Sequence, residues 1–315
     1  MLELVVVIVI FSMLMGLAVA VFRNANRDLG VRAAMNHVVT LLRSAAEHSK
    51  AEGAPTEVVC DVKANTIHTL TKETLLMFHM EDERGAFGRN TVPGGVQTVP
   101  GYISNAQRFN GSATMVCTNV PVNAKDPGIA IECHLYRTQA GRGKQTIAMI
   151  GKATPAELWI EGNGRLAGRV GNVQVTSGDY YLNKFDQWYS VQFVYNTLEA
   201  KLFVNDLEVG TRAGKAEWAA EGVFTIGSSR EGFNGIIDEM RVSLIIPRDV
   251  YTMPAETKFA FAQGTTFIEQ RYFIFWFNSK GRLDPSKHLS AVTFGLKSPT
   301  DQKNVTVTTQ GDVNR

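Results

Sequence analysis

The sequence predicts an α+β protein: a long N-terminal hydrophobic helix packed on a small antiparallel sheet, with an all-β sandwich inserted into the sheet. Residues 4–22 carry no charge and lead into apolar residues at helical spacing. From Thr56 the apolar period changes to two, as in strands. Residues 74–248 are rich in glycine and short alternating runs, without a helical period longer than two turns, which is typical of a β-sandwich.

The first apolar stretch, residues 1–22, is predicted to span a membrane or form a filament core. Its uncharged part is close to the roughly 20 residues that cross a hydrocarbon core. A cleavable secretory signal would have a basic start and a shorter apolar core. Glu3 stands inside the leading edge, and a charge at mid-membrane costs roughly 2.5–3.5 kcal/mol. We therefore expect Glu3 to have a function.

The predicted helix continues beyond this stretch and occupies residues 1–53. Gly53-Ala54-Pro55 should end it, because glycine suits a C-cap and proline disfavours helix at the preceding residue. Residues 57–62 and 66–70 then read as a β-hairpin. The second half of the helix should bury one apolar stripe, formed by Val31, Ala34, Met35, Val38, Leu41, Leu42 and Ala45.

The N-terminal run Leu2-Glu3-Leu4-Val5-Val6-Val7 resembles the start of type IV pilins and type II secretion pseudopilins. Three further stretches resemble the H-type pseudopilins: LLRSAAEHSKAEGAPTEVVCDV, YFIFWFNSKGRLDP and NVTVTTQGDV. The resemblance implies a pilin-like sheet built from residues 54–73 and 249–315. The sequence departs from the family at its front, where the basic leader is missing, so a plain signal anchor remains the alternative for this helix.

The pilin resemblance also implies how the chain would assemble. Glu3 would meet the N-terminal amine of a neighbouring subunit, and Glu3, Leu4, Val5, Val6 and Val7 would pack in a filament core. The implied partners are other copies of the chain, the inner membrane before assembly, a prepilin peptidase and the assembly machinery. The implied location is the bacterial inner membrane, followed by a periplasmic or extracellular filament.

The insert, residues 74–248, resembles the laminin-G-like, concanavalin-type jelly roll in three stretches. They are LLMFHMEDERGAFGRNTVPGGVQTVPGYISNAQRFNGS, QWYSVQFVYNTLEAKLFVNDLEVG and FTIGSSREGFNGIIDEMRVS. In the second stretch Trp188 is expected to pack in the core with Val191 and Phe193. In the third, Asp238 is expected to cap a turn by accepting backbone N–H bonds.

No residue is predicted to be catalytic, and the chain is not expected to be an enzyme. Glycosidases of this shape need two carboxylates that flank the scissile bond, on a strand with acidic residues at alternate positions, and no Glu-x-Asp-x-x-Glu run exists in this chain. Glu81, Asp82 and Glu83 are contiguous, so their side chains cannot all face one site. The four tryptophans could include a sugar-stacking platform, although such residues more often pack in a core: Trp159, Trp188, Trp218 and Trp276.

No cofactor or metal ligand is predicted, because the six histidines are scattered without ligand spacing. Calcium is compatible with sandwich loops that carry aspartates, here Asp179, Asp186 and Asp206, but no ligand set is assigned. Cys117 and Cys133 could pair in an oxidising compartment or stay as free thiols. A net charge of +2 with scattered basic residues gives no case for nucleic acid.

These observations predict a structural subunit of a type IV pilus-like or type II secretion pseudopilus filament. The sandwich would be displayed for surface adhesion or for glycan or protein binding. A minor pseudopilin at the tip of a secretion pseudopilus is one alternative. A membrane-anchored carbohydrate-active enzyme is the alternative from a different class.

Overall fold

The computed structural model describes residues 2–81, 91–118, 120, 128–140, 143–151, 155–218, 222–261, 272–299 and 301–314. The chain divides into two compact units. The terminal unit comprises Met1–Thr71 and Pro247–Arg315, and the sandwich unit comprises Lys72–Ile246. The sandwich unit begins at 72 rather than at the expected 74 and ends at 246 rather than at 248.

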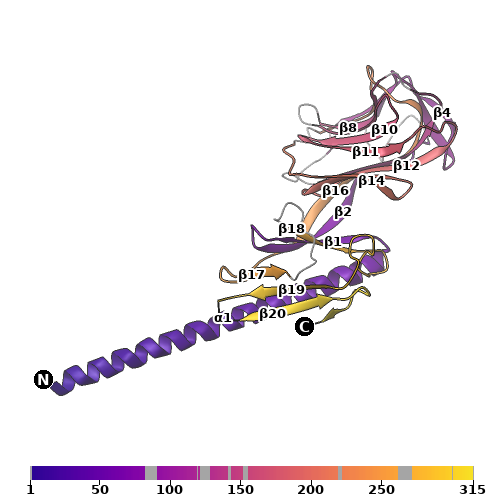
Figure 1. The fold of residues 1–315 in the computed structure, drawn as a ribbon. Helices are drawn as coiled ribbons and strands as arrows, with labels where there is room; N and C mark the ends of the chain where they lie inside the picture. Colours follow the sequence, from indigo (N-terminus) through magenta and orange to yellow (C-terminus); the bar gives the residue numbers. More distant parts are fainter. Residues whose placement is uncertain are drawn as a thin grey trace. The chain divides into compact units, whose positions relative to one another are not determined.

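The α+β class expected from the sequence is wrong, because the protein is mostly β. The described residues contain 21 strands and one helix, α1 (Leu2–Glu52). The larger core is formed by two sheets packed face to face, which is the architecture of a β-sandwich. A single helix at one end of the chain does not change that class (Figure 1).

In the terminal unit, the predicted apolar stripe of α1 is buried. Its residues lie at helical spacing on one side of α1, and all seven are at most 5% exposed. They share a hydrophobic cluster with phenylalanines of the neighbouring strands, among them Phe273, Phe275 and Phe294. The helix ends as expected, since Gly53 adopts a left-handed conformation with φ +64°.

The strands of the terminal unit form two antiparallel groups. The predicted hairpin is present, because β1 (Thr56–Asp61) pairs with β2 (Thr66–Phe78). On its other side β1 pairs with β18 (Tyr272–Phe277), so segments far apart in the sequence lie next to each other. The second group has the order β17 (Lys258–Phe261), β19 (Val292–Lys297), β20 (Gln302–Val307) and β21 (Val313–Asn314).

Among the residues that the structure describes, no helix has the length and apolar character needed to cross a lipid bilayer. The expected location in an inner membrane before assembly is therefore wrong. The predicted filament contacts, Glu3 and Leu4 to Val7, belong to α1, but their side chains lie outside the described residues.

The sandwich unit consists of two antiparallel sheets, sheet A and sheet B. Sheet A has the order β14 (Leu207–Ala213), β13 (Glu199–Val204), β12 (Trp188–Tyr195), β7 (Gly128–Arg137) and β16 (Asn234–Thr252). Two further strands, β5 (Asn105–Asn110) and β4 (Gln97–Pro100), continue it beyond β16. Sheet B has the order β11 (Val173–Tyr181), β10 (Arg165–Val170), β9 (Ala156–Ile160), β8 (Gln145–Ile150), β15 (Val223–Gly227), β6 (Thr114–Thr118) and β3 (Thr91–Gly94).

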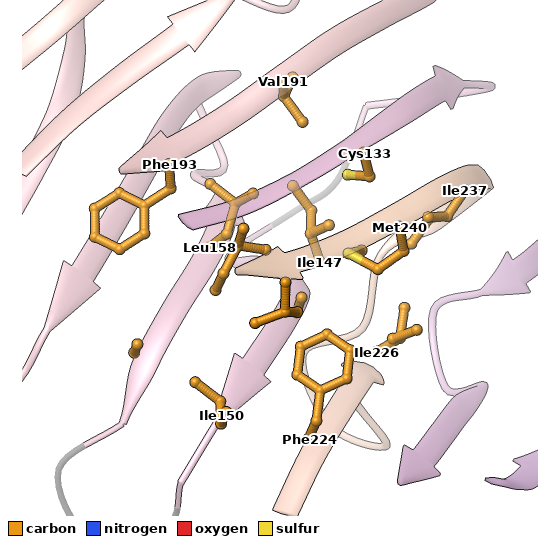
Figure 2. Packing of buried hydrophobic residues seen from close by; sticks show 14 of the residues in the cluster. Cys133, Ile147, Ile150, Leu158, Val191, Phe193, Phe224, Ile226, Ile237 and Met240 are labelled. Carbon is orange, nitrogen blue, oxygen red and sulfur yellow. The ribbon is translucent and has the colours of Figure 1, made fainter. Parts of the chain in front are cut away.

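The core of the sandwich lies between the two sheets, as Figure 2 shows for part of it. Val191 and Phe193 of β12, Leu158 of β9 and Phe224 of β15 belong to one cluster of buried residues. Phe193 is fully buried and lies so close to Gly168 of β10 that a Cβ there would stand 2.3 Å from its ring. The core therefore has no spare volume at this contact between sheets.

Of the two alternatives for Cys117 and Cys133, the structure has the free thiols: both are buried and no bridge joins them. Cys117 lies on β6 of sheet B and Cys133 on β7 of sheet A, and both belong to the sandwich core. Burial raises the pKa of the Cys133 thiol far above its usual value, which keeps it protonated and unreactive.

Candidate functional site

The outer face of sheet A carries a group of polar and aromatic side chains. In β12 the odd-numbered residues from Tyr189 to Tyr195 point into the core. Because neighbouring residues of a strand face opposite sides, Trp188 stands on the outer face and not in the core. The expectation that Trp188 packs with Val191 and Phe193 is therefore wrong by one residue of register.

A cavity of about 350 Å³ opens on this outer face. Its walls come from strands β2, β7, β12, β13 and β16 and from the turns beside them. Most of its lining is polar, with carboxylates, an amide, a hydroxyl, an imidazole and a guanidinium: Glu132, His134, Ser190, Gln192, Asp206, Glu239 and Arg241. Ile103 and Met77 add apolar surface. Such a mixture suits a ligand with both hydroxyl groups and apolar faces.

Four aromatic side chains lie against one another beside the cavity, and we call Tyr102, His134, Tyr136 and Trp188 the aromatic platform. Tyr102 stacks on His134, with ring centroids 4.1 Å apart and an interplanar angle of 19°. Trp188 lies 5.7 Å from Tyr102 and 5.4 Å from Tyr136, centroid to centroid. Tyr102 is 54% exposed, so the platform has an aromatic surface open to a ligand.

A β-bulge in β16 brings one wall of the cavity into place. Asp238 lies opposite His134 of β7, and Arg241 lies opposite Glu132, so β16 has one residue more than β7 across this interval. The extra residue is Glu239, whose φ is +49°, a conformation that non-glycine residues rarely adopt. As a result Met240 stays in the core while Glu239 and Arg241 both line the cavity.

Two of the three carboxylates that line the cavity have a basic neighbour. Glu132 forms an ion pair with Lys72. Glu239 faces His79, whose Nδ1 lies 3.0 and 3.1 Å from the two carboxylate oxygens. The balance of these charges leaves a site without a strong net sign, which favours a neutral ligand over a polyanion.

Asp206 reaches the cavity through the tight turn between β13 and β14. Asn205 and Asp206 have φ values of +50° and +64°, as in the two-residue turns that match the twist of a hairpin. The turn is fastened to β12, because the Asn205 side-chain oxygen accepts the Ser190 N–H at 2.9 Å. Asp206 is thus held at the edge of the cavity beside Ser190.

Asp238 lies beneath the platform and is fully buried. Its Oδ2 accepts the backbone N–H groups of Tyr102 and Ile103, each at 2.9 Å, and its Oδ1 accepts the N–H of Glu239 at 2.8 Å. Burial raises the pKa of this carboxyl, and the three N–H bonds oppose the shift. The prediction that Asp238 caps a turn is confirmed.

Sequence reasoning missed that Glu132, Asp206 and Glu239 meet in one cavity. A search for acidic residues on alternate positions of a single strand could not find them, because they come from β7, from a hairpin turn and from the bulge in β16. A usable signal was present in β7, where Glu132, His134 and Tyr136 alternate with buried apolar residues.

The other candidate residues are not gathered at this cavity. Trp159 and Trp218 are buried, and Trp276 belongs to the terminal unit. Among the described residues, no group of three or more histidine, cysteine, aspartate or glutamate side chains could hold a metal ion. The side chain of Asp179 lies outside the described residues, as do Asp82 and Glu83.

Two antiparallel sheets with the core between them define a jelly-roll β-sandwich with a polar and aromatic cavity on one outer face. Residues 87–244, which are 158 of the 315, match the family described as the concanavalin A-like lectin/glucanases superfamily. The chain belongs to this family. The predicted concanavalin-type jelly roll is confirmed, whereas the predicted pilin-like part finds no support in the comparisons.

Solved structures similar to this chain include domain 4 of AbnA, a GH43 extracellular arabinanase from Geobacillus stearothermophilus, solved with arabinotriose. The identity is 16% and the TM-score 0.44, over 55% of this chain and 93% of that one. A second is the binding domain of botulinum neurotoxin serotype D, with 11% identity and a TM-score of 0.42 over 54% of this chain and 47% of that one. A third is the binding domain of botulinum neurotoxin DC in complex with rat synaptotagmin II, with 11% identity and a TM-score of 0.41 over 74% of this chain and 73% of that one. No curated protein matches the sequence significantly.

Proposed function

We propose that the sandwich unit binds a neutral glycan on the outer face of sheet A. The observation that carries this proposal is the aromatic platform beside a cavity lined by polar side chains. A sugar ring has an apolar C–H face, which packs on an aromatic ring, and hydroxyls, which bond to carboxylates and amides. Gln192, Ser190 and Asp206 supply such groups within the same cavity.

Trp188 is the residue whose loss should weaken binding most. Binding of neutral oligosaccharides of glucose, xylose, arabinose and galactose to the full chain is measured by calorimetry. With Trp188→Ala we expect Kd to rise about tenfold or more, as for a central aromatic anchor. Trp276→Ala is the matched control, because Trp276 is also half-buried but belongs to the terminal unit. Absence of binding to every sugar, or equal loss in both variants, would contradict the proposal.

We further propose that the site binds without hydrolysing its ligand. Supporting this, Glu132 and Glu239 are each held by a basic neighbour, Lys72 and His79. Hydrolysis requires one carboxylic acid that donates a proton and a second carboxylate that acts on the sugar. We expect no release of reducing ends from the bound oligosaccharide. Release that disappears in Glu239→Gln would instead favour the carbohydrate-active enzyme.

The narrower function predicted from the sequence, a pilus-like or pseudopilus filament subunit, stays a prediction, as does its variant as a minor tip pseudopilin. Its support is the resemblance of residues 1–22 and of the late strands. The family match adds none, because it covers residues 87–244. If Glu3 pairs with a neighbour's N-terminal amine, Glu3→Ala should lower the fraction of the chain in sheared surface filaments. An unchanged fraction would contradict the filament function.

A further inference from the structure

One buried carboxylate connects two walls of the cavity. Asp238 Oδ2 holds the backbone of Tyr102 and Ile103, while its Oδ1 holds the backbone of Glu239. Ile103 and Glu239 both line the cavity, and Tyr102 stacks on His134, which lines it too. The groups that would contact a ligand are thus fastened to each other through a residue that no ligand can reach.

The turn that carries Tyr102 is built around this carboxylate. Gly101 donates its N–H to the Ser104 carbonyl at 2.9 Å, and Ser104 has a left-handed φ of +55°. A Cβ on Gly101 would lie 2.8 Å from Asp238 Oδ2 and 2.7 Å from the carbonyl carbon of Asn105. Only glycine therefore lets the turn approach the carboxylate closely enough for both N–H bonds.

Contacts within the turn are not enough to hold Tyr102 in its position, and the bonds to Asp238 are needed as well. Tyr102 is 54% exposed, and the stacking of its ring on His134 joins a turn to a strand of sheet A. A second carboxylate, Glu81, accepts the Asn105 N–H at 3.2 Å from an exposed position, where a hydrogen bond contributes less. The buried bonds of Asp238 are the stronger restraint on the turn, because water does not compete for them.

We propose that Asp238 is a positioning residue for the glycan site: it holds Tyr102 on His134 and sets the separation of the Ile103 and Glu239 walls. This inference rests on the proposed glycan binding, but the position of Tyr102 on His134 can be tested without a ligand. Asp238→Leu removes both acceptor oxygens with little change in side-chain size, so the N–H groups of Tyr102, Ile103 and Glu239 all lose their bonds. Both walls should be released.

The test follows the imidazole proton shifts of His134 by NMR in the ligand-free full chain. In the wild type the ring current of Tyr102 moves these resonances upfield, and Tyr102→Ala gives the unstacked reference. In Asp238→Leu we expect the resonances to move most of the way to that reference. Gly101→Ala should have the same effect, because the added Cβ pushes the turn from Asp238 without removing a buried charge.

Two control variants separate positioning from general loss of structure. Gly143→Ala adds a Cβ with nothing within 4 Å, and Asp61→Asn alters another carboxylate that caps a turn, through the Ala64 N–H at 2.7 Å. Both should leave the His134 shifts unchanged. The methyl resonances of Ile147, in the sandwich core, report whether each variant is folded. Wild-type His134 shifts in a folded Asp238→Leu or Gly101→Ala variant would overturn the proposal.

A double-mutant cycle on glycan binding then links position to affinity. If Asp238 acts through Tyr102, Tyr102→Ala should raise Kd about tenfold in the wild type and by less than about threefold in the Asp238→Leu background. Additive losses would show that Asp238 acts elsewhere and overturn its positioning role. If the wild type binds no sugar, the proposed function is overturned. If the Asp238 variant nevertheless loses the stacking of Tyr102 on His134, the structural role of Asp238 still holds.

Discussion

Two single residues with unusual backbone requirements, Glu239 and Gly101, shape the cavity on the outer face of sheet A. Glu239 occupies a strained left-handed position that places its carboxylate at the cavity, and Gly101 permits a contact that any larger residue would block. Neither feature stabilises the fold by itself. A strained backbone position persists only where the surrounding structure holds it in place. Here the three N–H bonds to Asp238 provide that restraint.

His288 is the residue from which we expect a pH effect on stability. Burial lowers its pKa below the ordinary 6.5, with the Asp284 carboxylate opposing the shift, and its Nε2 accepts the Trp276 N–H at 3.2 Å. A protonated Nε2 cannot accept this bond. Because the folded pKa is the lower one, the stabilisation is present above pH 6.5 and is lost as the pH falls through the folded pKa.

The free energy of unfolding of the wild type should therefore decrease more than that of His288→Gln between about pH 8 and pH 5. Denaturant titrations of both proteins at each pH measure this difference. His68, whose pKa burial also lowers, is present in both proteins and cancels in the comparison. Parallel pH profiles would contradict the role of His288.

At the scale of elements, the contact between β10 and β12 sets how closely the two sheets pack. Gly168 of β10 faces the Phe193 ring, and a Cβ would stand 2.3 Å from it. Gly168→Ala should destabilise the protein by about 1–3 kcal/mol, because the added methyl overpacks a full core. Chemical denaturation measures the loss, with Gly143→Ala as a control in open space.

The same contact can be relieved from its other side. Phe193→Leu shortens the ring that Gly168→Ala would strike, so the double variant should cost less than the sum of the two single changes. Strict additivity would mean that the sheets can separate locally, and that this contact does not limit their packing.

At the scale of the whole molecule, the two units have separate cores. The cluster of the sandwich unit contains no residue of α1, and the cluster that contains the α1 stripe includes no residue of 72–246. We expect residues 72–246, expressed alone, to give a soluble domain with one cooperative melting transition. A molten or aggregated product, under conditions in which the full chain folds, would contradict the independence of this unit.

The sequence by itself determined the features that depend on neighbouring residues. The end of α1 at Gly53, the hairpin of β1 and β2, and the short alternating strands of the sandwich follow from glycine, proline and a period of two. It also indicated that Asp238 caps a turn. The fold class was mistaken because a long apolar N-terminal run dominates the pattern, although it forms one helix beside 21 described strands.

Only the tertiary structure decided the site. Glu132, Asp206 and Glu239 converge because β7, the β13–β14 turn and the bulged β16 meet on one face of sheet A. The physical reason is that pairing between distant strands sets register, and one residue of register moves a side chain to the other face. Trp188 shows the consequence: the alternation of β12 was legible in the sequence, but only the packed sheets placed its tryptophan on the outer face, beside Tyr102.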